Sequence, residues 1–212
     1  GGLSLFWTPE YGNALLAGNC SPWAHHGLVA EDSSGQRWWE DYLSVNHALD
    51  ATRGELTVTG KLEDQPLTYR RRYRFANDAV EIALDIQAKG KVALAALWEN
   101  LPWLDGTIKA DGARLQVTGE EQPIASANPK VRLSTATAAE MRITDRHGRG
   151  LKIILDQPRP LRISRNGLDF AVTETRRGQF NRVQISLPVQ LRCGESIRLK
   201  YRLEPLAGKK PQ

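Results

Sequence analysis

Aromatic, acidic and imidazole side chains are concentrated between Asn19 and Asn46. Aromatic rings stack on the apolar faces of sugars or on bases, and neighbouring carboxylates and imidazoles hydrogen-bond to hydroxyl groups. This stretch therefore predicts a ligand surface. Its ligand-binding candidates are Trp23, His25, His26, Trp38, Trp39 and Glu40. A catalytic acid/base pair could also come from Glu31, Asp32, Glu40 or Asp41, but their spacing singles out none of them.

The alternative for the same stretch is structural. If Trp38-Trp39 lies in a strand, the two rings point to opposite faces, so that one belongs to the core and the other to the rim. His25-His26 splits in the same way, and an adjacent pair lacks the spacing of a metal site. The sequence therefore predicts no metal site.

A second aromatic and acidic cluster runs from Trp98 to Gly106. As a loop it would present Trp98 or Trp103 to a groove, with Glu99 or Asp105 alongside. Its alternative is a strand that ends in a Pro-terminated turn, with the tryptophans capping the core.

Several nucleotide and cofactor motifs are missing from the sequence. It contains no Gly-x-x-x-x-Gly-Lys-[Ser/Thr], no Gly-x-Gly-x-x-Gly, no Gly-x-Ser-x-Gly and no Cys-x-x-Cys. Their absence argues against nucleotide hydrolysis, dinucleotide redox chemistry, α/β-hydrolase catalysis and structural zinc. No cofactor is predicted.

Charge and cysteine usage narrow the range of partners. The net charge is +5, but the 29 basic residues are spread along the chain, which favours solubility over a nucleic-acid footprint. No apolar run approaches the roughly 20 residues of a membrane span. Cys20 and Cys193 could pair or remain thiols. The compartment stays open, with a periplasmic or secreted location slightly favoured.

Strict alternation of apolar and polar residues predicts an all-β protein. Three runs show it, Glu55–Leu62, Leu67–Phe75 and Val80–Ile86, and turn residues separate them. We expect an antiparallel meander with one buried face. That face should carry Leu56, Val58, Tyr73, Phe75, Val80, Ile82 and Leu84.

The arginines of the second run divide between the two faces. If Asn77-Asp78 closes a hairpin, Arg74 faces Glu81 and Arg70 faces Asp85, which predicts cross-strand ion pairs on the wet face. Arg71 falls on the apolar face, opposite Gly60. A buried guanidinium must find a carboxylate or carbonyl partners.

Further strands are expected beyond the meander, with turn signals at Asp111-Gly112, Arg146–Gly150 and Asn166-Gly167. Val92–Leu101 fits either a helix or a buried strand. We predict one large two-sheet antiparallel β-sandwich with little or no helix over residues 1–206, in preference to a barrel. Residues 207–212 are expected to form a flexible basic tail.

The pattern resembles the galactose-mutarotase-like supersandwich domains, which also occur C-terminal to the helical toroid of polysaccharide lyases and in related glycosidases. The resemblance rests on Gly27–Asp32, leading through an aromatic segment into the ladder, and on the closing strand Gly194–Leu203. It implies a carbohydrate ligand. Free-standing epimerases of this group use a catalytic His and Glu, for which the candidates here are His25, His26, Glu31 and Glu99.

The sequence leaves three hypotheses open. The first is an accessory or glycan-binding domain of a larger polysaccharide-processing protein. Its partners would be an oligo- or polysaccharide and other domains of a longer parent chain. The second is a free-standing epimerase or lyase with a His/carboxylate pair, and the third is an interaction sandwich without a small ligand. Exposed tryptophans beside a groove favour the first, a His and a carboxylate converging in a deep pocket the second, and a flat apolar patch the third.

Overall fold

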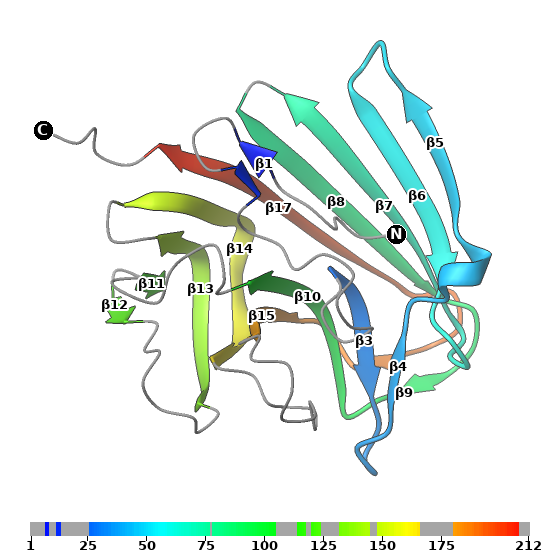
Figure 1. Ribbon diagram of the computed structural model, residues 1–212. Helices are drawn as coiled ribbons and strands as arrows, with labels where there is room; N and C mark the ends of the chain where they lie inside the picture. Colours follow the sequence, from blue (N-terminus) through cyan, green and yellow to red (C-terminus); the bar gives the residue numbers. More distant parts are fainter. Residues whose placement is uncertain are drawn as a thin grey trace, which may run out of the picture.

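The computed structural model describes residues 7–8, 12–13, 26–76, 78–104, 114–117, 120–123, 132–144, 148–165 and 180–207 (Figure 1). This part of the chain is almost entirely antiparallel β-structure, with one 3-10 turn, η1 (Tyr42–Ser44). The strands are β1 Trp7–Thr8, β2 Gly12–Asn13, β3 Gly27–Glu31, β4 Arg37–Trp39, β5 Asn46–Asp50, β6 Glu55–Lys61, β7 Leu67–Ala76, β8 Ala79–Ala88, β9 Val92–Ala93, β10 Ala96–Leu104, β11 Arg114–Val117, β12 Glu120–Pro123, β13 Arg132–Thr144, β14 Arg149–Arg165, β15 Phe180–Ser186, β16 Gln190–Leu191 and β17 Ser196–Ala207. The all-β prediction is confirmed.

Most of these strands belong to one large sheet. Its order is β4-β3-β10-β15-β14-β17-β8-β7-β6-β5, and β13 pairs with β14 and carries β11 and β12 at the side. The predicted meander is its β6-β7-β8 portion, in which Ala76 lies opposite Ala79 across a two-residue connection. The pairs β1-β2 and β9-β16 form two separate small sheets.

The long strand β14 turns the sheet from one arm into the other. Residues 149–155 of β14 pair with β17, whereas residues 161–164 pair with β15. Pro158 and Pro160 lie at or next to the change of partner, and the neighbouring β13 takes up the irregularity with a register shift between Ala138 and Glu140. We call β17-β8-β7-β6-β5 the first arm and β15-β10-β3-β4 the second arm.

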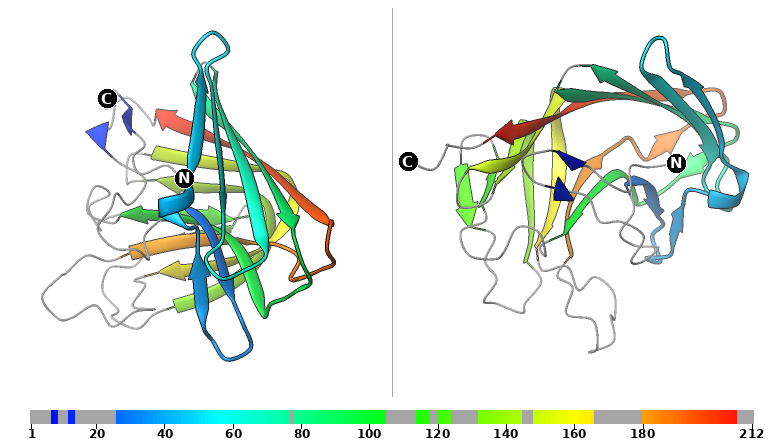
Figure 2. Two further views of the ribbon diagram at one scale, coloured as in Figure 1. Left: turned by 90° about the vertical axis from the view of Figure 1, so that its right-hand side faces the viewer. Right: turned by 45° about the horizontal axis from the view of Figure 1, so that its top comes forward.

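The two arms curl toward each other and enclose the core (Figure 2). Side chains of β7 contact side chains of β10, although four strands separate these two along the sheet. The two arms are also joined where the end of β4 meets the end of β6. There, Glu40 bridges to Leu62, the Asp41 amide donates to the Lys61 carbonyl at 2.9 Å, and the Glu63 amide donates to the Trp39 carbonyl at 2.9 Å.

The predicted buried face of the meander is mostly correct. Val58, Tyr73, Val80, Ile82 and Leu84 are buried in the common core, and Leu56 is partly buried against it. Phe75 differs, because 47% of its surface is exposed. It lies on the predicted face but near the end of β7, where the described residues leave half of the ring uncovered. The alternation therefore predicts the face on which a residue lies, but not how deeply it is buried.

Other strand predictions have mixed outcomes. The hairpin through Arg146–Gly150 is confirmed by the β13-β14 pairing of Thr144 with Gly150, and Val92–Leu101 is strand in β9 and β10. The Asp111-Gly112 and Asn166-Gly167 hairpins lie outside the described residues. Cys193 is a free, exposed thiol. Within the described residues, no helix has the length and apolar character needed to cross a bilayer.

We expect Ile82→Ala to lower the free energy of unfolding by about 2–5 kcal/mol, because it leaves a cavity in the closed part of the core. Phe75→Ala removes more atoms from a half-exposed position and should cost less than Ile82→Ala. Urea denaturation of both variants measures the difference. An equal or larger loss for Phe75→Ala would contradict the burial described here.

Candidate functional site

Arg71 is the least expected residue of the core. Alternation along β7 directs Leu67, Tyr69, Arg71 and Tyr73 to the same inner face, and Arg71 has 0% of its surface exposed. A charge removed from water in this way is tolerated only when it is paired and hydrogen-bonded. Its partners therefore indicate what the centre of the molecule is built around.

Two carboxylates hold the Arg71 guanidinium. Its Nε donates to Oε1 of Glu99 at 3.1 Å and its Nη2 donates to Oε2 of Glu99 at 2.8 Å, which forms a bidentate pair across the two arms. The same Nη2 donates to Oε1 of Glu40 at 2.6 Å. The guanidinium carbon also lies 5.1 Å from the centre of the Tyr69 ring. We predicted carboxylate or carbonyl partners for Arg71, and the structure shows two carboxylates. Its cross-strand neighbour is Val58 and not Gly60.

His26 and Tyr201 complete the arrangement on the other side of Glu99. Nε2 of His26 lies 2.5 Å from the Tyr201 hydroxyl and 3.0 Å from Oε1 of Glu99. The Tyr201 hydroxyl donates to the same Oε1 at 2.8 Å. The imidazole stands edge-on to the rings of Tyr73 and Tyr201, with centroids 6.2 Å apart in both cases. We call Arg71, Glu99, Glu40, His26 and Tyr201 the central network.

Glu40 approaches the backbone closely because Gly27 has no side chain. The Leu28 amide donates to Oε1 of Glu40 at 2.7 Å. A Cβ at position 27 would lie 2.7 Å from the same oxygen, which is too close for any side chain without displacement of the carboxylate. Gly27 thus makes room for the second carboxylate beside Arg71.

Electrostatics in the central network fix the charge states of its acids. Burial would raise the pKa of Glu99, but the Arg71 guanidinium and the hydrogen bond from His26 outweigh it and lower the pKa from 4.5 to about 2. Burial would likewise raise the pKa of Glu40, but the charge of Arg71 and its hydrogen bond outweigh burial, so that the pKa lies below its usual value. For Tyr201, burial followed by the nearby Glu99 charge raises the pKa well above its usual range. At neutral pH the network contains two carboxylates, one guanidinium and a neutral phenol.

The structure brings together some of the predicted site residues. His26, Glu40 and Glu99 converge in the central network, and all three are buried. Glu31 is elsewhere, paired with Arg37 on the neighbouring strand. Trp23 and His25 lie outside the described residues.

The tryptophans separate by face as the alternation predicts. Trp38 lies opposite Ala30 and packs against the core, whereas Trp39 lies opposite Val29 on the other face of the second arm. Trp98 shares that other face, buried, with the Arg162 guanidinium 5.2 Å from its ring centre. Trp103 lies in β10, opposite Asn181. Their predicted contact with a glycan stays a prediction.

The sequence signals for the central network were uneven. Arg71 stood out as an arginine on an apolar face. Tyr201 did not, because it continues the alternation of Ile197, Leu199 and Leu203 and looks like an ordinary core residue. In the part of the chain that the structure describes, no group of three or more His, Cys, Asp or Glu side chains is arranged to hold a metal ion.

Comparison by sequence finds no match, either to a protein-family model or to a curated protein. Comparison by structure does. A proposed aldose 1-epimerase from Escherichia coli K12 superimposes with a TM-score of 0.61 at 12% identity, over 97% of this chain and 92% of its own. A galactose mutarotase related enzyme from Lactobacillus acidophilus superimposes with a TM-score of 0.59 at 8% identity, over 91% of this chain and 87% of its own.

This chain has the galactose-mutarotase-like fold. The same supersandwich is found as part of a larger chain, the GH36 alpha-galactosidase AgaA A355E from Geobacillus stearothermophilus. The TM-score is 0.51 at 10% identity, over 93% of this chain but only 31% of that one. At such identities the likeness shows the fold alone. The supersandwich therefore occurs both as nearly a whole protein and as about a third of one.

We expect Glu99→Gln to lower the free energy of unfolding by about 3–5 kcal/mol, because it leaves the buried Arg71 charge with one carboxylate fewer. A depressed folded-state pKa contributes stability above pH 4.5 that is lost as the pH falls from 4.5 toward 2. The variant should therefore lose less stability than the parent over this interval. The loss that remains is the part that comes from protonation of Glu40. Urea titrations from neutral pH down to pH 2 measure both effects.

Glu81→Gln is the matched control. It makes the same chemical change in an exposed ion pair, in which Glu81 lies 3.9 Å from Arg74, and should cost less than about 1 kcal/mol. If the two variants were equally stable and equally pH-dependent, the central network would not be the stabilising element described here.

Proposed function

We propose that this chain is a carbohydrate-associated domain that binds glycan as an accessory unit of a larger polysaccharide-processing protein and performs no chemistry itself. The observation that carries the proposal is the enclosure of the central network. His26 and Glu99 are the histidine and carboxylate that converge, and both side chains have 0% of their surface exposed.

The charge state of Glu99 supports the same conclusion. A general base must reach the proton that it removes, and its pKa should lie near the working pH. Glu99 is enclosed, and its pKa of about 2 makes it a weak proton acceptor at neutral pH. Its two oxygens already accept hydrogen bonds from Arg71 and Tyr201. The pair is better suited to joining the two arms than to transferring protons.

The glycan half of the proposal is supported by fold-level likeness. The similar structures include the proposed aldose 1-epimerase and an alpha-galactosidase, both named for carbohydrate substrates. The alpha-galactosidase contains this fold as about a third of its length, which is the arrangement expected of an accessory unit. This inference is an analogy between folds.

An aldose epimerase is the second candidate. It is favoured by one specific observation, the hydrogen-bonded convergence of His26, Glu99 and Tyr201, because anomer interconversion requires a proton donor and a proton acceptor close together. It is also favoured by the size of the proposed aldose 1-epimerase from Escherichia coli, since this chain covers 92% of that protein.

Two measurements on the purified chain test the proposal. Affinity electrophoresis and calorimetry against a panel of neutral and acidic oligosaccharides should detect binding of at least one class. Polarimetry of freshly dissolved α-glucose and α-galactose should show no faster mutarotation than buffer. Failure to bind any glycan would contradict the accessory role.

Faster mutarotation would instead favour the epimerase, provided that it depends on the central network. His26→Asn should then abolish the acceleration. His47→Asn is the matched control, because His47 is an exposed histidine of the edge strand β5 and should leave the rate unchanged.

A further inference from the structure

The face of the first arm that points away from the core carries a shallow groove. Two adjoining hollows of about 470 and 660 Å³ lie over β6, β7, β8 and β17. Two neighbouring rows of side chains cross the junction of these hollows. The first row is Arg72, Ala83 and Lys200, and the second is Arg70, Asp85 and Arg198. We call these six residues the outer groove.

Positive charge exceeds negative charge within the outer groove. Four cations surround one carboxylate, that of Asp85. Arg198 donates to Asp85 at 2.6 Å and Arg72 lies 3.8 Å from it. The adjacent row, by contrast, is balanced: Arg74 and Arg202 alternate with Glu55 and Glu81. On the other side, Lys61 and Lys89 also line the second hollow, so the excess ends at the balanced row and continues toward these two lysines.

Arg70 and Lys200 have no ion-pair partner among the described residues. The predicted pair of Arg70 with Asp85 is correct in register, but that carboxylate is engaged by Arg198 and Arg72 instead. The predicted pair of Arg74 with Glu81 is present at 3.9 Å. Nε of Arg72 is also buried without a hydrogen-bond partner in the described part of the chain.

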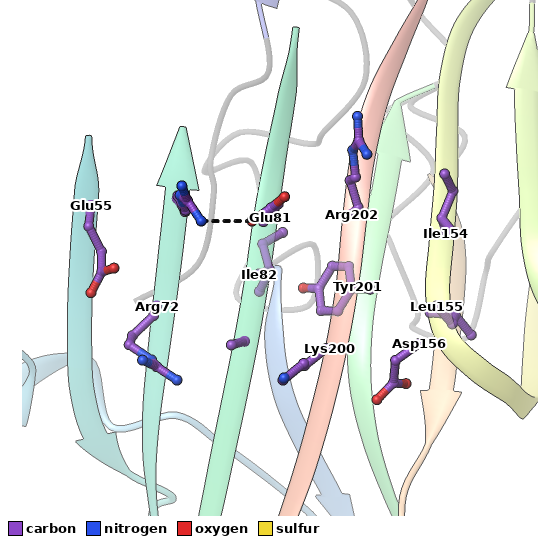
Figure 3. A pocket seen from close by; sticks show the side chains of 12 residues that line it. Glu55, Arg72, Glu81, Ile82, Ile154, Leu155, Asp156, Lys200, Tyr201 and Arg202 are labelled. Atoms are coloured by element: carbon purple, nitrogen blue, oxygen red, sulfur yellow. Dashed lines mark ion pairs between the residues drawn. The ribbon is translucent and has the colours of Figure 1, made fainter. Parts of the chain in front are cut away.

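Ala83 leaves a gap between two of these cations. It lies opposite Arg72 on one side and Lys200 on the other, and its small side chain does not fill the space above β8. Figure 3 shows the cationic ends of Arg72 and Lys200 both directed toward β8. Two strand spacings separate their backbones, about 9.6 Å. Both side chains can therefore reach one anionic group above Ala83.

We propose that the outer groove binds the carboxylates of an acidic, uronate-containing polysaccharide, with Arg72 and Lys200 holding one carboxylate over Ala83 and Arg70 the next. The inference rests on the proposed function and names its ligand class. Rows two residues apart along a strand are about 6.8 Å apart, so successive cations suit a chain with separated charges. Guanidinium groups match the planar geometry of carboxylates.

The surroundings favour a polysaccharide over a nucleic acid. Thr57, Thr59 and Thr68 lie along the same face, and their hydroxyl groups can hydrogen-bond to sugar hydroxyls. The Asp85 carboxylate can also accept hydrogen bonds from sugar hydroxyls. Glu55, Glu81 and Asp156 line the smaller hollow, of about 470 Å³. These acids oppose anionic contacts beyond the outer groove, where a DNA duplex, with one charge per about 1.7 Å of its axis, would place further phosphates.

The experiment compares binding of an oligogalacturonate, its neutral methyl ester, a sulfated oligosaccharide and a single-stranded DNA oligomer by calorimetry. The test variant is Arg70→Ser/Lys200→Ser. Both side chains are exposed, so the double variant should melt at the same temperature as the parent. The matched control is Arg53→Ser/Arg142→Ser, which removes two exposed cations outside the outer groove.

We expect the parent to prefer the oligogalacturonate over its ester, and added salt to weaken this binding. The double variant should lose at least about tenfold in affinity, because two charge-assisted contacts are removed, while the control should change by less than about twofold. Equal losses in both variants would overturn the inference, since they would indicate a general charge effect.

The remaining outcomes separate the two proposals. If the ester binds as well as the acid, and the double variant binds as the parent does, the outer groove is not the binding site, whereas the proposed function stands. Preference for the sulfated oligosaccharide or for DNA overturns the carboxylate assignment. If no glycan binds at all, both proposals fail.

Discussion

The burial of one guanidinium is the constraint on which the structure depends. Arg71 cannot remain charged in an apolar core unless carboxylates reach it, and its two carboxylates come from the second arm: Glu99 from β10 and Glu40 from the end of β4. Because these contacts join strands that are far apart along the sheet, they fix how closely the arms approach. Apolar packing favours closure of any kind, whereas paired charges favour one particular closure.

This constraint also explains why a histidine and a carboxylate meet without forming an open site. Glu99 is occupied on both oxygens, and His26 fills the remaining space beside Tyr201. The same hydrogen bonds that stabilise the core lower the proton affinity of the carboxylate. A residue pair that looks catalytic by its chemistry is therefore explained more simply as part of the joint between the arms.

Features that depend on local alternation could be predicted from the sequence. The faces of β7 and β8, the two-residue connection between them and the anomaly of Arg71 all depend on a period of two. The identity of the partners could not be predicted. Glu99 comes from β10, whose position opposite β7 depends on the curl of the whole sheet, and Tyr201 comes from β17, which joins the arm of β7 by pairing with β8 over a long sequence separation. The exposure of Phe75 is missed because alternation predicts the face of a residue and not what covers it. That residues 1–206 form one domain stays a prediction.

The position of β17 has a consequence for how the chain reaches this state. In the described sheet, β17 is the strand that joins β14 to β8, yet it is the last strand in chain order. His26 and Tyr201, which touch in the folded protein, are 175 residues apart. During synthesis the two arms must therefore wait, with their apolar faces uncovered, until β17 emerges. We expect slow closure of this sheet and dependence on chaperones while the chain is being made.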